Sequence, residues 1–389
     1  MSVTPLALHS PRAVGATLRA HGWDDGQASA AAGGLSPLAF HVTGLDQDAL
    51  EALVRLSGTL GLEVLTGDDW AVLSGSRSRL SALARPWLVP PALSQLALDV
   101  GLAMPAEPPA DWITAGGAVS LDQPVLMGIL NVTPDSFSDG GRYVGLDAAL
   151  AQVDALVEAG AAIVDVGGES TRPGRTVPVS TAVELERVVP VIEALVRRHP
   201  GLLLTVDTVK VEVAKAALGA GAAAINDVSG LRLEPGIAHA VATAKAGLVL
   251  MHSRGSILEI ASYTHAQYEN VLGEVLTELQ TAVAVATDAG VGLESIALDP
   301  GLGFSKTPEQ SLELFDRLEG LQALGRPLVV GPSRKRFLGA ATGQPIEARD
   351  RATATACALA WERGARIFRV HDVAGAREAL VLARAIGGP

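Results

Sequence analysis

From Val125 onward the chain repeats one pattern, in which a short, mostly apolar segment ends in polar residues and an amphipathic helical segment follows. Short apolar runs of this kind are typical of strands buried on both faces of a parallel sheet. The predicted strands are Val125–Leu130, Ala161–Val166, Leu202–Val206, Ala222–Ile225, Gly247–Met251, Ile296–Leu298, Pro327–Val330 and Ala365–Val370. The predicted helices are Thr181–Arg198, Lys210–Gly219, Gln267–Ala289, Pro308–Leu324, Asp350–Arg363 and Val373–Ile386.

Eight strand–helix units between residues 125 and 389 predict a (β/α)8 TIM barrel, a fold that is typically about 250 residues long. An open, doubly wound α/β sheet is the alternative. The first strand is not followed by a glycine-rich dinucleotide-binding fingerprint, and this favours the barrel.

In residues 1–104 the apolar and polar segments follow a different order, and they predict a small α+β domain. Its strands are expected at Leu38–Val42, Leu62–Leu65 and Trp70–Leu73, and a helix is expected to begin at Asp46. A ferredoxin-like arrangement is one possibility. Because the segment carries no metal-ligand spacing, nucleotide loop or nucleophile motif, it has no assigned function. Residues 105–124, which include PAEPPADW, are predicted to be a linker, and residues 125–389 form the barrel domain.

The composition limits the partners and the compartment. A formal net charge of −12 argues against nucleic acid and anionic membrane surfaces as partners. The longest charge-free run, residues 26–45, is interrupted by glycines and a proline, so no membrane span is expected. The single cysteine, Cys357, excludes a disulfide within the chain. With no signal peptide recognised, we expect a soluble cytoplasmic protein.

Polar residues follow the predicted strands, at the end of a barrel where catalytic groups lie. One set combines hydrogen-bond donors with positive charge, and its motifs contain no compensating carboxylate: Asn131, Ser170, Thr171, Arg172, Arg369 and His371. Such a set suits a phosphate or diphosphate. A second set offers two carboxylates, an amide and an amine: Asp207, Asn226, Asp299 and Lys335. These groups match the edges of a flat heterocycle such as a pterin.

Structural roles compete with these interpretations. Helix N-capping could explain Asp207, Asp227, Ser333 and Asp372 individually. The histidines His252 and His371 could each satisfy a buried backbone group. Helix capping does not explain why so many polar and charged residues occur together at the ends of the predicted strands.

The ordered motifs MGILNVTPDSFSDGG, DVGGESTRPG, VDT, INDVSG, LMH, DPGLGF, PSRK and RVHD extend over about residues 124–386. In this order they resemble dihydropteroate synthase, the folate-pathway enzyme that sulfonamides inhibit. The resemblance implies a transferase that condenses 7,8-dihydropterin-CH₂-diphosphate with p-aminobenzoate to give 7,8-dihydropteroate and diphosphate. It also implies Mg²⁺ as cofactor and a possible homodimer. We expect an SN1-like route, because an aryl amine is a poor nucleophile and a charge-neutralised diphosphate is a good leaving group.

The resemblance also implies residue roles. Pterin would contact Asp207, Asn226, Met251, Asp299 and Lys335. The diphosphate would contact Asn131, Thr171, Arg172, Arg369 and His371, with Asn131 as the metal ligand. p-Aminobenzoate would face Phe137, Thr171, Phe304 and Ser333. The catalytic groups would be Asp207, Lys335, Arg172, Arg369 and His371.

Three positions depart from the family pattern: Leu302 and Ser253, where the family often has Phe and Met, and Pro332. They bear on the rim of the p-aminobenzoate pocket rather than on the reaction. Two other functions are alternatives. A methyltetrahydrofolate-binding methyltransferase domain would share the barrel but hold no diphosphate, and a non-catalytic pterin-binding or regulatory protein would not need the complete set of catalytic motifs.

Overall fold

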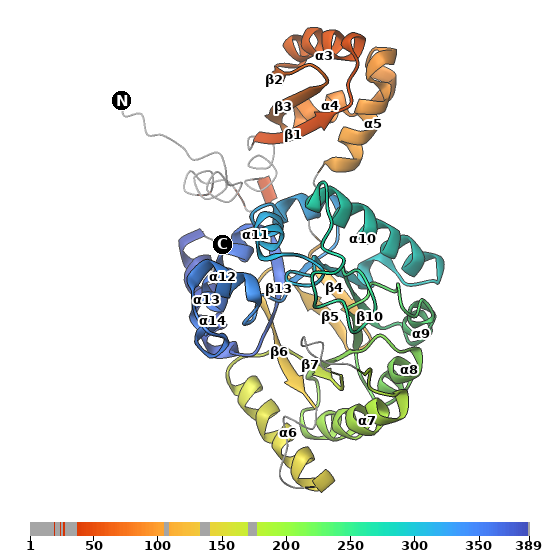
Figure 1. Ribbon diagram of the computed structural model, residues 1–389, viewed down its shortest axis with the longest axis vertical. Helices are drawn as coiled ribbons and strands as arrows, with labels where there is room; N and C mark the ends of the chain where they lie inside the picture. Colours follow the sequence, from red (N-terminus) through yellow and green to blue (C-terminus); the bar gives the residue numbers. More distant parts are fainter. Residues whose placement is uncertain are drawn as a thin grey trace. The chain divides into compact units, whose positions relative to one another are not determined.

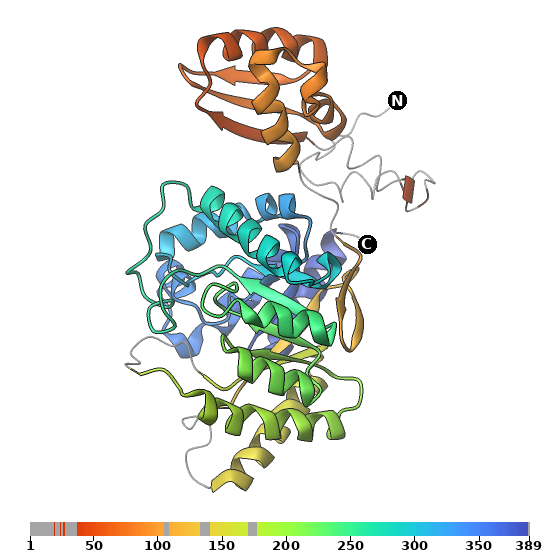
Figure 2. The same ribbon diagram turned by 90° about the vertical axis from the view of Figure 1, so that its right-hand side faces the viewer.

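The computed structural model describes residues 37–104, 109–132, 141–169 and 177–387, together with Arg19, Asp24, Gly26 and Gln27 (Figures 1 and 2). The chain divides into two compact units, one of residues 1–105 with 384–389 and one of residues 106–383. None of the helices in the described ranges has the length and apolar character that crossing a membrane requires.

The first unit contains the small α+β domain that the sequence predicts. Its antiparallel sheet has the order β1-β3-β2, formed by β1 (Pro37–Thr43), β2 (Glu63–Thr66) and β3 (Trp70–Ser76). Its helices are α3 (Gln47–Leu60), α4 (Arg77–Leu83) and α5 (Ser94–Ala103). Asp46 caps α3 by accepting a hydrogen bond from the Ala49 backbone N–H, as its place before the helix indicates. Between residues 37 and 104 the sheet has three strands, so the four-stranded ferredoxin-like arrangement is not present there.

The second unit is a closed barrel of eight parallel strands, as predicted, and this excludes the open-sheet alternative. In chain order the strands are β6 (Val125–Asn131), β7 (Ile163–Gly167), β8 (Leu203–Asp207), β9 (Ala224–Asp227), β10 (Gly247–Met251), β11 (Ile296–Asp299), β12 (Leu328–Val330) and β13 (Ala365–Val370). The barrel closes by pairing of β13 with β6. Figure 1 shows the helices arranged around these strands.

The barrel helices are α6 (Gly141–Glu158), α7 (Thr181–Arg198), α8 (Val211–Gly219), α9 (Gly236–Ala244), α10 (Val271–Asp288), α11 (Pro308–Asp316), α12 (Arg336–Thr342), α13 (Asp350–Glu362) and α14 (Val373–Gly387). Two predicted helices are shorter than expected. α10 begins at Val271 because the Asn270 side chain caps it. The expected helix 308–324 is divided into α11 and a 3-10 helix, Leu318–Leu324, which ends at the left-handed Gly325.

Part of the stretch predicted as a linker forms a β-hairpin of β4 (Asp111–Thr114) and β5 (Gly117–Ser120), drawn beside the barrel in Figure 2. Trp112 of this hairpin is fully buried, and its indole N–H donates to the Ser295 carbonyl at 2.8 Å. Trp112 packs with the first inward-facing residues of the barrel strands, such as Met127 and Ile163. The hairpin therefore covers the amino end of the barrel. The prolines before it favoured a linker, whereas the glycine pair between DWIT and AVS was the available signal for a hairpin turn.

The barrel interior changes from apolar to polar along the strands. The layer near the amino ends is hydrophobic and includes Val249, Ala297, Val329 and Ile367. Toward the carboxyl ends the inward positions carry buried polar groups, among them Asp165, Thr205 and Asn226. A polar interior at this end is where a barrel of this type binds its ligands.

Candidate active site

A fully buried carboxylate, Asp165 on β7, occupies the centre of the polar end of the barrel. It accepts hydrogen bonds from Thr205 Oγ1 at 2.5 Å, Asn226 Nδ2 at 3.0 Å and Arg369 Nε at 2.6 Å. Sequence reasoning did not select this residue. The available signal was its position two residues after Ile163 and two before Gly167 in a buried strand, which points the charge into the barrel.

Arg369 on β13 reaches across the barrel and bridges two carboxylates. Besides its bond to Asp165, it donates from Nη2 to Asp207 Oδ2 at 2.8 Å. The expectation that its positive charge has no compensating carboxylate is therefore wrong. Burial alone would lower the pKa of the guanidinium, but Asp165 and Asp207 raise that pKa above its ordinary value. Burial raises the pKa of the Asp207 carboxyl to about 7, and Arg369 opposes this shift.

Lys335, at the start of α12, lies over the Phe304 ring and is hydrogen-bonded to the loop after β11. Its Nζ is 3.7 Å from the ring centroid and donates to the Leu302 carbonyl at 2.7 Å. Burial lowers the pKa of the Lys335 amine to about 7, against the effect of Asp299. Burial also raises the pKa of Asp299, and Lys335 opposes that shift. The Lys335 amine can therefore change protonation state near neutral pH.

The strand register brings the other predicted pterin residues together. Asp207 is paired with Asn226 across β8 and β9, and Met251 is paired with Asp299 across β10 and β11. Met251 is 3 % exposed, and Phe304 packs against the same small apolar cluster. The end of the barrel thus presents polar groups beside an apolar wall, a combination that suits a flat heterocycle.

The predicted p-aminobenzoate residue Ser333 contacts the predicted diphosphate residue His371. The Ser333 hydroxyl accepts from the His371 backbone N–H at 3.2 Å and lies 2.9 Å from His371 Nδ1. The hydroxyl can either donate to Nδ1 or accept from it, according to the tautomer of the imidazole. The two predicted subsites meet at this pair.

Asn131 lies at the end of β6, in register with Gly167 of β7. A Cβ added to Gly167 would lie 3.7 Å from Asn131 Oδ1 and 3.7 Å from the Asp207 Cβ, so glycine leaves space between these side chains. Four further site predictions fall outside the described residues: Phe137, Ser170, Thr171 and Arg172.

Two of the residues that capping could explain do have structural roles. Asp372 accepts from the Gly375 N–H at 3.1 Å and caps α14. Asp227 accepts from the Ser229 and Leu231 N–H groups at 2.7 and 2.8 Å and shapes the turn after β9. By contrast, Asp207 and Ser333 contact other members of the site.

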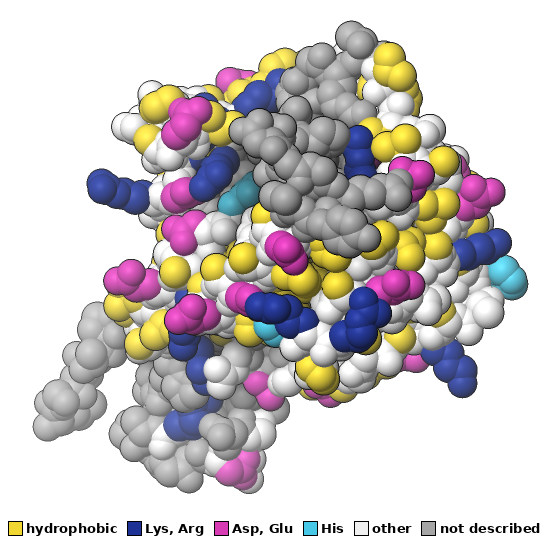
Figure 3. All heavy atoms as spheres, turned by 90° about the horizontal axis from the view of Figure 1, so that it is seen from below, with side chains coloured by type: hydrophobic (Ala, Val, Ile, Leu, Met, Phe, Trp, Pro, Cys, Tyr) yellow, Lys and Arg dark blue, Asp and Glu magenta, His cyan; other side chains and the backbone are white. Residues whose placement is uncertain are grey.

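The surface drawn in Figure 3 carries basic and acidic side chains interspersed among apolar ones. On that face the described residues form no broad basic patch of the kind that binds nucleic acid. In the part of the chain that the structure describes, no group of three or more His, Cys, Asp or Glu side chains is arranged to hold a metal ion.

Comparisons with known proteins agree with this geometry. Residues 127–371 match the sequence profile of the family described as "Pterin binding enzyme". The dihydropteroate synthase of Synechocystis is 46% identical over 250 residues, which are 64% of this chain and 85% of that protein. The Mycobacterium leprae dihydropteroate synthase is 46% identical over 268 residues, which are 67% of this chain and 93% of that protein.

Solved structures give the same result. The Xanthomonas albilineans dihydropteroate synthase with 4-aminobenzoic acid has a TM-score of 0.66 and 43% identity, covering 72% of this chain and 99% of that one. The same enzyme in complex with 7,8-dihydropteroate has a TM-score of 0.64 and 41% identity, covering 72% of this chain and 99% of that one. The chain therefore belongs to the dihydropteroate synthases of the pterin-binding enzyme family.

Proposed function

We propose that this protein joins 7,8-dihydropterin-CH₂-diphosphate to p-aminobenzoate and releases 7,8-dihydropteroate and diphosphate. The observation that carries the proposal is the buried Asp165–Arg369–Asp207 group beside Lys335 and Asp299 at the mouth of the barrel. The ligands of the X. albilineans enzyme, 4-aminobenzoic acid and 7,8-dihydropteroate, support the same substrate and product.

The pterin binds to the carboxylate and amide groups at the ends of β8, β9 and β11. Asp207 and Asp299 accept from the ring N–H and amino groups, and Asn226 and Lys335 bind the ring carbonyl and nitrogens. Asp165 fixes the Asn226 amide through the 3.0 Å bond to its Nδ2. This bond uses one of the two Nδ2 N–H groups, so the amide can still accept through its carbonyl oxygen and donate through its second N–H. Met251 provides an apolar surface for the ring face.

The diphosphate binds at the opposite side of the mouth, near Asn131 and His371, with Thr171 and Arg172 from the loop after β7. Asn131 supplies one carbonyl oxygen beside the space left by Gly167. This fits Mg²⁺, which usually takes only one or two protein oxygens and completes its shell with substrate phosphates and water. When bound there, Mg²⁺ would neutralise negative charge on the leaving group.

The reaction follows an SN1-like course. The bond between the pterin methylene carbon and the diphosphate oxygen breaks, and the bond electrons leave with the diphosphate. Arg369 and His371 stabilise the departing charge, and the Asp207 carboxylate stabilises the positive charge that develops on the pterin. The p-aminobenzoate nitrogen then attacks the methylene carbon and releases a proton to water. Phe137, Phe304 and Ser333 orient the aromatic ring of p-aminobenzoate.

Product formation in purified protein tests the proposal. The full chain is incubated with both substrates and Mg²⁺, and dihydropteroate is identified by chromatography. Asp207→Asn is expected to reduce kcat/KM by about 100-fold or more, because it removes the charge that stabilises the developing cation. Asp288→Asn, which changes an exposed carboxylate on α10, is the matched control and should retain wild-type kinetics. Binding of the pterin without any product would instead favour a non-catalytic pterin-binding protein.

The proposal also includes the oligomeric state of the protein and its cellular location. Large apolar side chains are exposed on α13 and α14, among them Leu359, Val381 and Leu382. They support a homodimer formed through these helices, which light scattering would detect as twice the chain mass. The cytoplasmic location stays a prediction that subcellular fractionation would test.

A further inference from the structure

A lysine that the reaction does not use lies fully buried behind the proposed site. Lys306 follows β11 and has 0 % exposure. Its Nζ lies 2.8 Å from His252 Nδ1, 3.2 Å from the Phe304 carbonyl oxygen and 3.3 Å from the Gly301 carbonyl oxygen. An ammonium has three N–H donors, and these three acceptors match them one to one.

The partner of His252 fixes which atom accepts from Lys306. His252 Nε2 lies 3.0 Å from Glu278 Oε2, and an ionised carboxylate can only accept. The imidazole proton is therefore on Nε2, and Nδ1 presents its lone pair to Lys306. Burial lowers the pKa of His252 to about 4, with Lys306 adding to the shift, so the ring is neutral at pH 7. The three side chains form one chain of hydrogen bonds, from the loop after β11 to α10.

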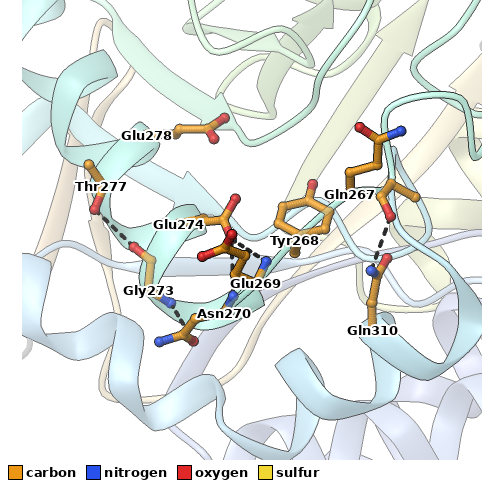
Figure 4. A pocket seen from close by; sticks show the side chains of 10 residues that line it. Gln267, Tyr268, Glu269, Asn270, Gly273, Glu274, Thr277, Glu278 and Gln310 are labelled. Carbon is orange, nitrogen blue, oxygen red and sulfur yellow. Dashed lines mark hydrogen bonds between the residues drawn. The ribbon is translucent and has the colours of Figure 1, made fainter. Parts of the chain in front are cut away.

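Glu278, at the outer end of this series of hydrogen bonds, is held by further contacts. Glu278 accepts from Arg254, which also donates to Glu274 at 2.8 Å and lies 4.0 Å from the Tyr268 ring centroid. Figure 4 shows Glu278, Glu274 and Tyr268 on the wall of an open pocket of about 920 Å³. Lys306 is thus connected to a rigid, partly exposed cluster on α10 and the segment before it.

At the other end of this series of hydrogen bonds, Lys306 contacts the loop of residues 301–304, which also contacts Lys335. Lys306 binds the carbonyls of Gly301 and Phe304, and between them the Leu302 carbonyl accepts from Lys335. The Phe304 ring lies under the same Lys335 amine. Gly301 has φ +67°, and a side chain there would overlap the His252 carbonyl oxygen, so this turn is tightly packed. Leu302, which replaces a Phe common in the family, is 1 % exposed in the barrel core.

We infer that Lys306 is a positioning residue of the synthase reaction: through the carbonyls of Gly301 and Phe304 it fixes the loop that orients Lys335 and Phe304. This role rests on the proposed function, since Lys335 would contact the pterin and Phe304 the p-aminobenzoate. Burial lowers the pKa of the Lys306 amine to about 7; Lys335 and Arg254 add to this shift, and Asp299 and Glu278 oppose it. The contacts with the two carbonyls do not depend on this shift, because the amine has N–H donors in either protonation state.

Steady-state kinetics of the full chain test this role. Lys306→Met should raise the KM for p-aminobenzoate and lower kcat, reducing kcat/KM by about 10- to 100-fold. Lys215→Met, which removes an exposed amine on α8, is the control and should match the wild type. In a Phe304→Leu background, Lys306→Met should cost less than it does alone, because part of its effect is exerted through Phe304. Multiplicative losses would indicate a general structural role and overturn the inference.

Variants of His252 keep the test decisive if Lys306→Met does not fold. His252→Asn retains an oxygen acceptor near the position of Nδ1, whereas His252→Leu removes the acceptor. The inference predicts substantial activity in the first variant and a loss in the second like that of Lys306→Met. Equal activity of the two folded variants would contradict it. A wild-type chain that forms no dihydropteroate would overturn the proposed function and this inference with it. An active wild type with an unchanged Lys306→Met variant would overturn the inference alone.

Discussion

Arg369 and Asp165 are separated by 204 positions in the sequence, yet they form the 2.6 Å contact at the centre of the site. The bridge from Arg369 to both Asp165 and Asp207 uses the planar geometry of the guanidinium, which a lysine could not reproduce. This pairing changes the role that is expected of Arg369. It pairs with the carboxylates of Asp165 and Asp207, in addition to the role toward the diphosphate that we propose for it.

The protonation states of Asp207 and Lys335 predict a bell-shaped pH profile. Burial raises the pKa of Asp207 to about 7 and lowers the pKa of Lys335 to about 7. As the pH falls through this range, Asp207 gains a proton and loses the charge that stabilises the pterin cation. As the pH rises, Lys335 loses its proton and its positive charge. Both changes should reduce kcat/KM, so the maximum is expected close to pH 7.

Measurement of kcat/KM from about pH 5 to about pH 9 checks this prediction. Lys335→Arg keeps its positive charge throughout and should make the alkaline limb shallower. A wild-type profile that stays level on both sides of pH 7 would show that neither group titrates in the reaction.

The sequence was sufficient to predict that Asp207, Asn226, Asp299 and Lys335 lie at the carboxyl ends of barrel strands, because each belongs to a recognisable motif there. Their contacts with the pterin stay a prediction. The sequence was not sufficient to select Asp165, His252 or Lys306 as members of connected networks. Their hydrogen-bond partners lie on other strands and helices. Which side chains come within hydrogen-bonding distance depends on the three-dimensional fold. A charge within an apolar strand, as at Asp165, was the one available signal.

Among the secondary-structure elements, the start of α7 is held by a buried ion cluster. Lys210, the residue before α8, pairs with Glu169 at 2.6 Å and with Glu184 of α7. Glu169 also accepts from the Val179 N–H at 2.8 Å, and so joins the end of β7 to the segment before α7. The cluster thus joins the end of β7, the start of α7 and the residue before α8.

Lys210→Met should therefore destabilise the protein strongly. The change removes the Lys210 ammonium from the carboxylates of Glu169 and Glu184, whose side chains are only 6% and 1% exposed. Loss of one partner from a buried ion pair typically costs about 3–5 kcal/mol of unfolding free energy. Lys215→Met on the exposed face of α8 should change it by no more than about 0.5 kcal/mol. Urea unfolding of the two variants compares them directly, and similar midpoints would mean that the cluster adds no stability.

Element boundaries followed from the sequence where local chemistry determines them. The predicted helix at Thr181–Arg198 agrees with α7, whose Ser180 cap is evident in the sequence. Glycine and proline residues predicted secondary structure less reliably where tertiary packing determines it. The proline-rich stretch before Asp111 gave no indication that Trp112 would be buried under the barrel.

At the scale of the whole molecule, the burial of Trp112 determines where the catalytic part of the chain begins. All predicted site residues lie after residue 130, so we expect residues 109–389 to fold and catalyse without residues 1–108. A fragment that begins at residue 121 lacks the hairpin and exposes Met127 and Ile163 at the amino end of the barrel.

Thermal unfolding and specific activity of the two fragments test this boundary. The fragment 109–389 should retain the activity of the full chain, and the fragment 121–389 should unfold at a clearly lower temperature. Equal stability of the two would show that the hairpin is dispensable. A folded but inactive longer fragment would show that the first unit contributes to the site or to assembly.

The proposed reaction couples loss of diphosphate to formation of a carbon–nitrogen bond. A time course with limiting p-aminobenzoate, in which diphosphate and dihydropteroate are both quantified, tests it most directly. We predict one diphosphate for each dihydropteroate formed, with both reactions strongly reduced by Asp207→Asn. Release of diphosphate without dihydropteroate, or formation of neither product by folded wild-type protein, would contradict the account.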